Sequence, residues 1–308
     1  MKKFFADAAK SRIEITKAQA KAISNMYKDL SGEIAKERKL LERNANVSSI
    51  LRSQYLSNLS HQIDRELQRM NAIQETLIRR SMKAAASAVV QNNEKFLSKI
   101  GLSISGAYSH VPSDVVVEIA TGQIYEGRWN LSTAIWKNSA KHRSDIQTII
   151  AKGVAGQKST YEIAKDLENY VNPAARKDWQ WSKVYPGTSK VVDYNAQRLA
   201  RTMVSHAYQD SFVRTTKNNP FIEEYIWLAS GGDRMCEICA ERDGKTFSKD
   251  ELPLDHPNGM CTFEVVTPSY DEIGSRLADW VNGDDDPEID RFARDLGYTS
   301  TTLKSKVR

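Results

Sequence analysis

This chain of 308 residues has few residues that cross-link, constrain or loosen a backbone, with only 3 cysteines, 8 prolines and 15 glycines. Its mean hydropathy is -0.54, and no stretch approaches the ~18 uninterrupted apolar residues of a membrane-spanning helix. The apolar start at Phe4 and Phe5 is interrupted by Asp7 and again by Lys10, so we expect no signal peptide. These absences exclude an integral membrane protein and predict a soluble protein made in a reducing cytoplasm.

The sequence also lacks the short motifs of common catalytic sites. It contains no G-x-x-x-x-G-K-[ST], no G-x-G-x-x-G, no G-x-S-x-G and no H-E-x-x-H. The adjacent Glu223 and Glu224 lie in an alternating pattern that points them to opposite faces of a strand, so they cannot share a proton. We therefore predict that the protein is not an enzyme and takes no small-molecule substrate.

The net charge of +5 is distributed unevenly along the chain. Residues 1–100 carry about twice as many basic as acidic residues, whereas the rest of the chain is slightly acidic. A basic segment can bind phosphate groups or an acidic partner surface, but it can also be a solvated face that keeps a protein soluble. Both interpretations stay open. No aromatic residues alternate with the basic ones, as a platform for single-stranded nucleic acid would need.

The N-terminal third is predicted to form two long amphipathic helices. Residues 3–43 contain no proline and only one glycine, and residues 48–100 repeat the same pattern. Apolar residues recur at spacings of three and four: Ile23, Met26, Tyr27, Leu30 and Ile34, then Leu51, Tyr55, Leu59, Ile63, Leu67, Met70, Ile73, Leu77 and Ile78. A hairpin joined near residues 44–49 would bury little of itself, so we expect an outside partner.

The remainder of the chain predicts a small α+β region between helices. A Gly/Ser stretch at 101–114 marks a boundary. We expect a strand at 115–119, a helix at 131–151 and a short helix that begins with a Ser159/Glu162 capping box. A loop at 172–190 and a helix at 191–218 follow, and then strands at 221–228 and 263–266. Helices at 270–281 and 288–296 and a basic tail at 300–308 are expected at the end. Ile163, Ala164 and Leu167 are expected to face inward after the capping box.

The fold class is therefore mainly α with a small α+β C-terminal domain, a long N-terminal helical hairpin and a Cys/His knuckle. A length of 308 residues suggests roughly two domains. Along the chain we distinguish a long basic helical segment (1–105), a helical middle region (115–190), an α+β domain with the Cys/His cluster (191–270), and C-terminal helices with a tail (271–308).

All three cysteines lie within 26 residues, together with one histidine. Cys236 and Cys239 form a C-x-x-C, and His256 and Cys261 follow it. Zinc prefers thiolate and imidazole ligands in a closed tetrahedron, and a C-x-x-C turn presents two sulfurs to one ion. The spacing predicts a structural zinc site at Cys236, Cys239, His256 and Cys261.

Other interpretations of this cluster stay open. Reduced cysteines can simply pack a small core, or the C-x-x-C can be a redox pair, although no βαβ unit is predicted around it. Asp243 and Asp255 are nearby carboxylates that could replace a ligand. Asp255-His256 beside a C-x-x-C is also similar to the HNH nucleases, whose histidine activates water next to a metal. No histidine follows His256, and Asn258 and Asn282 are weak substitutes. A zinc-associated nuclease is thus the alternative function.

The C-terminal half carries an ordered series of short motifs. They are Trp136, Ile149–Gly153, Gly156, Ser159, Ile163–Leu167, Ala200–Thr202, Ala207, Tyr208, Tyr225, Trp227, Asp233–Cys239, Asp243–Phe247 and His256–Thr262. In this order, over residues 130–268, the chain resembles the Mu F-like, or phage head morphogenesis, family of minor capsid proteins. Two positions depart from the family pattern. Met203 stands where an acidic residue usually follows Arg-Thr, and Gly259-Met260 replace a cysteine and an arginine of the usual His-Pro-Asn-Cys-Arg-Cys ending.

The resemblance implies a structural role in the virion. Such proteins are minor components of the phage head, associated with the portal protein at the portal vertex and with packaged double-stranded DNA, and they act in head assembly or genome ejection. It implies scaffold or major capsid protein as further partners, with no membrane partner. The expected location is the capsid interior or the portal vertex, and the host cytoplasm during assembly. Because Met203 replaces the acidic residue, no catalytic role is carried over to its helix.

Overall fold

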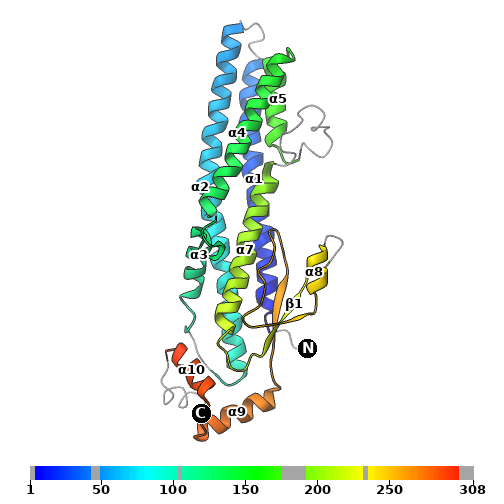
Figure 1. Cartoon of the computed structure of the whole chain (residues 1–308). Helices are drawn as coiled ribbons and strands as arrows, with labels where there is room; N and C mark the ends of the chain where they lie inside the picture. Colours follow the sequence, from blue (N-terminus) through cyan, green and yellow to red (C-terminus); the bar gives the residue numbers. More distant parts are fainter. Residues whose placement is uncertain are drawn as a thin grey trace. The chain divides into compact units, whose positions relative to one another are not determined.

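The computed structural model describes residues 4–42, 49–102, 106–128, 130–174, 192–231 and 235–297. The predicted loop at 172–190 beyond residue 174, the helix junction at 43–48 and the basic tail lie outside these ranges. The described part is mainly helical with one small antiparallel sheet, which confirms the predicted fold class (Figure 1). Among the described residues, none of the helices has the length and apolar character to cross a membrane.

The chain divides into two compact units, each assembled from segments that are far apart in sequence. The helical unit contains Lys17–Ile78 and Gly127–Ala200, and the cysteine unit contains Met1–Thr16, Arg79–Glu126 and Arg201–Arg308. Three helices supply residues to both units: α1 (Ala6–Glu42), α2 (Ser49–Lys99) and α7 (Val192–Thr216). The two units therefore differ from the four consecutive regions expected from the sequence.

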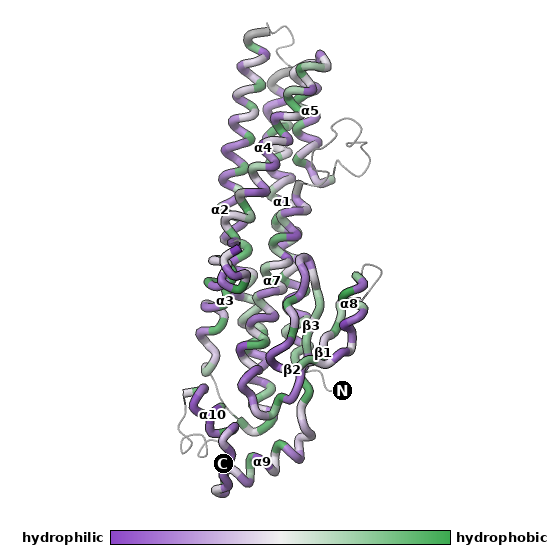
Figure 2. The backbone as a smooth tube through the Cα atoms, viewed as in Figure 1, coloured by the Kyte–Doolittle hydropathy of each residue, from purple (hydrophilic) through white to green (hydrophobic). Residues whose placement is uncertain are grey.

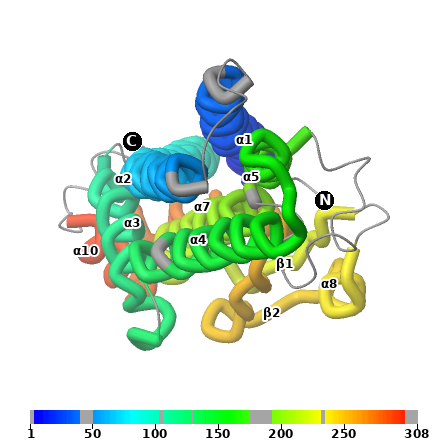
Figure 3. Tube along the Cα trace, turned by 90° about the horizontal axis from the view of Figure 1, so that it is seen from above, coloured from blue at the N-terminus to red at the C-terminus, as the bar shows by residue number. Residues whose placement is uncertain are grey.

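In the helical unit, α1 and α2 pack with α4 (Leu131–Ala155) and α5 (Thr160–Val171), as Figure 3 shows from above. The predicted apolar stripe of α1 is largely confirmed, since Ile23, Tyr27, Leu30 and Ile34 are at most 4% exposed. The α2 stripe is confirmed at Leu59, Ile63, Leu67, Met70 and Ile78, which are all buried.

Two residues assigned to the α2 stripe do not belong to it, because Leu51 and Ile73 are 55% and 49% exposed. At 3.6 residues per turn they lie about 120° and about 80° around the helix from Ile63. Gln74 takes the inward position beside Ile73 instead and is buried. The prediction from spacings of three and four was therefore wrong at these two positions, because each carries an apolar side chain on a neighbouring face of the helix.

The turn between α4 and α5 is built as the sequence predicts. Ser159 caps α5 by accepting from the backbone N–H of Glu162, and the Glu162 carboxylate accepts from the backbone N–H of Ser159 at 2.7 Å. Ile163, Ala164 and Leu167 are fully buried, as expected. Gly153 lets α4 approach this helix closely, because a Cβ atom there would lie 2.6 Å from the Ile163 side chain.

In the cysteine unit, the strand prediction at 115–119 is wrong. The β-branched run at 115–119 is helical and not a strand, since it lies in α3 (Val111–Thr121). Pro112 begins the helix with a suitable φ angle, and Val115 and Ile119, four residues apart, are both fully buried. Burial of one helix face therefore overrides the strand preference of β-branched residues. Gly122 ends the helix at φ 88°, and a short 3-10 turn (Gln123–Tyr125) follows.

The sheet has the order β2-β1-β3 and is antiparallel throughout. Strands β1 (Glu224–Leu228) and β3 (Thr262–Val266) confirm the two predicted strands, while β2 (Thr246–Ser248) was not predicted. Both β1 and β3 contain buried apolar residues, and hydrophobic stretches of the sheet are green in Figure 2. Tyr225 pairs with Val265 at the sheet centre. Helices α8 (Glu237–Arg242), α9 (Tyr270–Asn282) and α10 (Pro287–Asp295) complete the unit.

Candidate metal centre

The C-x-x-C motif lies at the first turn of α8. Cys236 is the N-cap residue of this short helix, and its sulfur accepts from the backbone N–H of Cys239 at 3.4 Å. This capping turn brings both sulfurs to the same end of the helix. The sequence therefore folds locally so that two thiol groups face one point in space.

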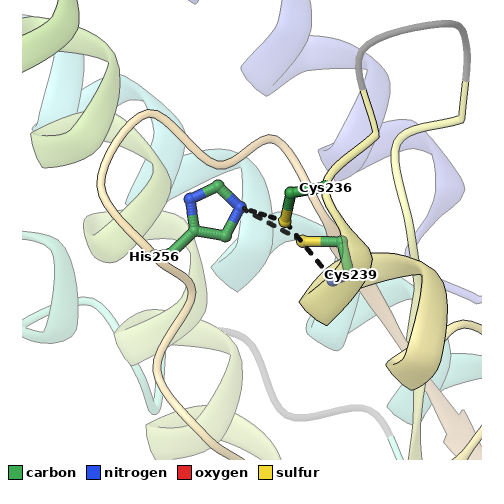
Figure 4. Close-up of side chains that lie close together, drawn as sticks. All are labelled: Cys236, Cys239 and His256. Carbon is green, nitrogen blue, oxygen red and sulfur yellow. Dashed lines mark hydrogen bonds between the residues drawn. The ribbon is translucent and has the colours of Figure 1, made fainter.

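The imidazole of His256 meets both sulfurs, as Figure 4 shows. Its Nε2 atom lies 3.3 Å from the Cys236 Sγ atom and 3.2 Å from the Cys239 Sγ atom. Cys261 joins from the start of β3, with its Sγ atom 3.3 Å from that of Cys239. All four residues predicted as ligands are thus brought into one cluster.

The cluster consists of two overlapping triads that share Cys239. One is Cys236, Cys239 and His256, and the other is Cys239, Asp255 and Cys261, each with its ligand atoms within 4.8 Å of one another. A tetrahedral zinc ion with bonds of about 2.0–2.3 Å holds its ligand atoms roughly 3.5–3.8 Å apart. The three distances of 3.2–3.3 Å need to open by only a few tenths of an ångström, so each triad fits a metal. Cys261 is not within 4.8 Å of both Cys236 and His256, so it has to move closer to the first triad for all four residues to hold one ion. Asp243 is elsewhere, where it accepts from the backbone N–H of Ala229 at 2.8 Å.

The thiols differ in their electrostatic surroundings. The pKa of Cys236 is lowered by hydrogen bonds from Cys239 and by the neighbouring His256, which favours a thiolate. Burial raises the pKa of Cys239 and of Cys261, so these two buried thiols hold their protons unless a cation lies beside them. Ligation by a metal reverses that preference, because the ion binds the deprotonated sulfur.

Asp255 organises the loop that carries His256 and Cys261. Its carboxylate accepts from the backbone N–H of His256 at 2.9 Å and from that of Cys261 at 3.2 Å. Gly259 lies directly against this carboxylate, because a Cβ atom there would be 2.2 Å from both oxygens. A residue with a side chain at position 259 would therefore clash with this carboxylate.

Helix α7 holds the same loop with a row of polar side chains. Thr202 accepts from the backbone N–H of Asn258 at 2.8 Å, and Ser205 donates to the Gly259 carbonyl at 2.8 Å. Gln209 accepts from the backbone N–H of Asp255 at 2.8 Å. Arg201 also donates to the Asn258 side chain. These contacts fix the loop relative to the helix, and none of them was predicted.

His206, also on α7, is buried between this loop and Tyr125. Its Nε2 atom lies 3.0 Å from the Asp255 carbonyl oxygen, and its Nδ1 atom lies 2.5 Å from the Tyr125 hydroxyl. Burial lowers the pKa of His206 to about 4, so the ring is neutral at pH 7 and donates through Nε2. Met203 on the same helix is fully buried and contributes to the core.

Arg12 contacts the Cys/His loop although it lies far from it in the sequence. It is fully buried and donates to the carbonyl of Cys261 at 2.9 Å and to that of Met260 at 2.6 Å, with its guanidinium 4.8 Å from the centre of the Tyr208 ring. Nearby, the buried Glu264 accepts from the backbone N–H groups of Phe4 and Phe5. One signal was present: Arg12 continues the spacing of three and four that leads through Thr16 and Gln19 to the buried stripe of α1.

Both ring nitrogens of His256 have partners within the protein. Nε2 faces the two sulfurs, and Nδ1 lies 3.0 Å from the Pro257 carbonyl oxygen, so both ring nitrogens are engaged within the protein. Cys239 and Cys261 are buried, whereas Cys236 and His256 are partly exposed. Comparison of the chain with models of known families, with curated proteins and with solved structures gives no match.

Proposed function

We propose that this protein is a structural, non-enzymatic minor capsid protein of the Mu F-like type. Its partner is the portal protein at the portal vertex, and it acts in head assembly or in genome ejection. Double-stranded DNA and the scaffold or major capsid protein are further proposed partners, and its proposed location is the virion, with the host cytoplasm during assembly.

One observation supports this proposal most. Motifs of the resemblance that are up to 60 residues apart in sequence meet at one place: Arg201 and Thr202 on α7 bond the His256–Thr262 loop, which in turn faces Cys236 and Cys239. The part of the series from Arg201 onward thus lies in one folded unit. Asp233 and Arg234 of the same series lie outside the described residues.

The proposed cofactor is one zinc ion with a structural role. Cys236, Cys239 and His256 would hold it, with Cys261 as the fourth ligand. When bound, the ion would cross-link the start of α8 to the 253–261 loop, which leads into β3. Structural zinc supplies about 10–16 kcal/mol of apparent binding free energy, enough to decide whether a small region folds.

The test of the proposed function is assembly. The protein is co-expressed with its portal protein and the other head proteins, and proheads are isolated by sedimentation. We expect it to co-purify with the portal oligomer and to be present in proheads. Absence from both would refute the proposal. Purified protein incubated with plasmid and Mg²⁺, Mn²⁺ or Zn²⁺ tests the nuclease alternative, since cleavage abolished by His256→Ala would replace the structural interpretation.

A further inference from the structure

The exposed face of α1 within the helical unit has an unusual distribution of charge. Lys17, Lys21, Lys28 and Lys39 are all exposed. At 100° per residue they lie within about 20° of one line along the helix. Three small residues between them lie within about 40° of the same line: Ser24, Gly32 and Ala35. We call these seven residues the lysine face.

Acidic residues of the same stretch are kept away from this face. Asp29, Glu33 and Glu37 lie about 100° or more around the helix from Lys28. Asp29 and Glu33 line a groove of about 380 Å³ that α1 shares with α2, so they face a neighbouring helix. A helix that needed only solubility would mix charges of both signs on its exposed face. Between Lys17 and Lys39 they are segregated, and the exposed Glu14 lies one turn before Lys17.

Gly32 leaves the helix backbone uncovered on this face. It lies in the middle of a 37-residue helix, where glycine is weaker than alanine as a helix former. A Cβ atom at this position would meet nothing within 4 Å, so packing within the chain does not require a glycine. Its φ angle is helical, so backbone conformation does not require one either. A partner surface can approach the helix backbone closely at this position.

We propose that the lysine face is a binding surface for the sugar-phosphate backbone of double-stranded DNA. The distance from Lys17 to Lys39 is about 33 Å along the helix, close to the ~34 Å of one turn of B-DNA. Lysines are flexible point charges that suit phosphates without regard to sequence, and the small residues let the helix lie against the duplex. The face has no aromatic residue on which the bases of a single strand could stack. This inference names the contact residues for the DNA partner of the proposed function and rests on that function for its setting only.

The test measures binding of the full chain to a labelled duplex of about 30 base pairs, by fluorescence anisotropy over a range of salt concentrations. The test variant is Lys21→Gln with Lys28→Gln. The control is Lys36→Gln with Lys245→Gln, which changes the net charge equally. Lys36 lies off the face and pairs with Glu33 at 2.6 Å, and Lys245 pairs with Glu241 at 3.2 Å.

The test variant is expected to reduce the slope of log affinity against log salt by about 1.8, since each lost phosphate contact removes about 0.9. The control should keep the wild-type slope. The proposal would be overturned if both variants lost the same amount of slope, or if the test variant lost none. It would also be overturned if the wild type did not bind DNA at low salt, or if polyglutamate displaced the labelled duplex as effectively as unlabelled duplex. The result is separable from the head-assembly test: a chain that binds DNA through this face but never enters proheads refutes only the proposed function.

Discussion

Gly259→Ala is expected to damage the Cys/His loop by steric conflict with one carboxylate. The new Cβ atom would lie 2.2 Å from both oxygens of Asp255, far inside van der Waals contact. Asp255 is 3% exposed, and its two oxygens already accept from the backbone N–H groups of His256 and Cys261. The carboxylate therefore cannot rotate away without losing a hydrogen bond that orders a predicted ligand.

The magnitude follows from these two costs. Overpacking of a dense interior costs about 1–3 kcal/mol, and leaving one buried hydrogen-bonding group unsatisfied costs about 1–3 kcal/mol. The two costs overlap because moving the carboxylate relieves part of the overlap, so we expect a loss of about 2–4 kcal/mol in the free energy of unfolding. Urea unfolding followed by circular dichroism measures it, and competition with a chelator shows whether the zinc affinity falls as well.

Gly274→Ala is the matched control. Gly274 lies in α9 with a helical φ angle, and a Cβ atom there would meet nothing within 4 Å. Alanine is the better helix former, so this variant should be stabilised by about 0.5–1 kcal/mol. If Gly259→Ala unfolds at the same urea concentration as the wild type or the control, the inferred contact with Asp255 is wrong.

Three further substitutions test other parts of the structure. Arg12→Met should lower the free energy of unfolding by about 2–4 kcal/mol in urea titrations, because two carbonyls lose their donor. Arg12→Lys should not restore the stability, because a single ammonium cannot reproduce the planar fork of the guanidinium. Wild-type stability of either variant would contradict the buried position of Arg12. Gly153→Ala should cost about 1–3 kcal/mol through overlap with Ile163, and an unchanged midpoint would show that the two helices can separate freely. Cys236→Ser with Cys239→Ser should remove about one zinc per chain by elemental analysis, whereas a wild-type protein that is folded and free of metal would end the zinc proposal.

The sequence predicted those features of the fold that depend on neighbours along the chain. Helical periodicity located α1, α2 and α7, and the Ser159/Glu162 pair located a cap whose atoms are three residues apart. The strand prediction at 115–119 was wrong because α3 packs its valine and isoleucine on one buried side. Tertiary burial decides such cases, and periodicity within five residues cannot detect it.

The candidate site was predictable to the extent that its residues are close in sequence. Cysteine and histidine spacing led to the four clustered residues, since few other roles place those types so close together. Arg12 was missed because its contacts are made with residues 248 and 249 positions away. Ser205, His206 and Gln209 were missed because polar residues on a helix have many other uses, and only the folded chain shows which loop they meet.

The contacts of Arg12, Phe4 and Phe5 have a consequence for how the protein is made. These early residues acquire their partners only when Met260, Cys261 and Glu264 have been synthesised. At about 5–20 residues per second, the first helix waits on the ribosome for at least 10 s or so before its buried arginine can be enclosed. Contacts this distant in sequence also slow the search for the native state. Phe5 and Arg12, both fully buried in the folded protein, therefore lack their native partners during nearly the whole of translation.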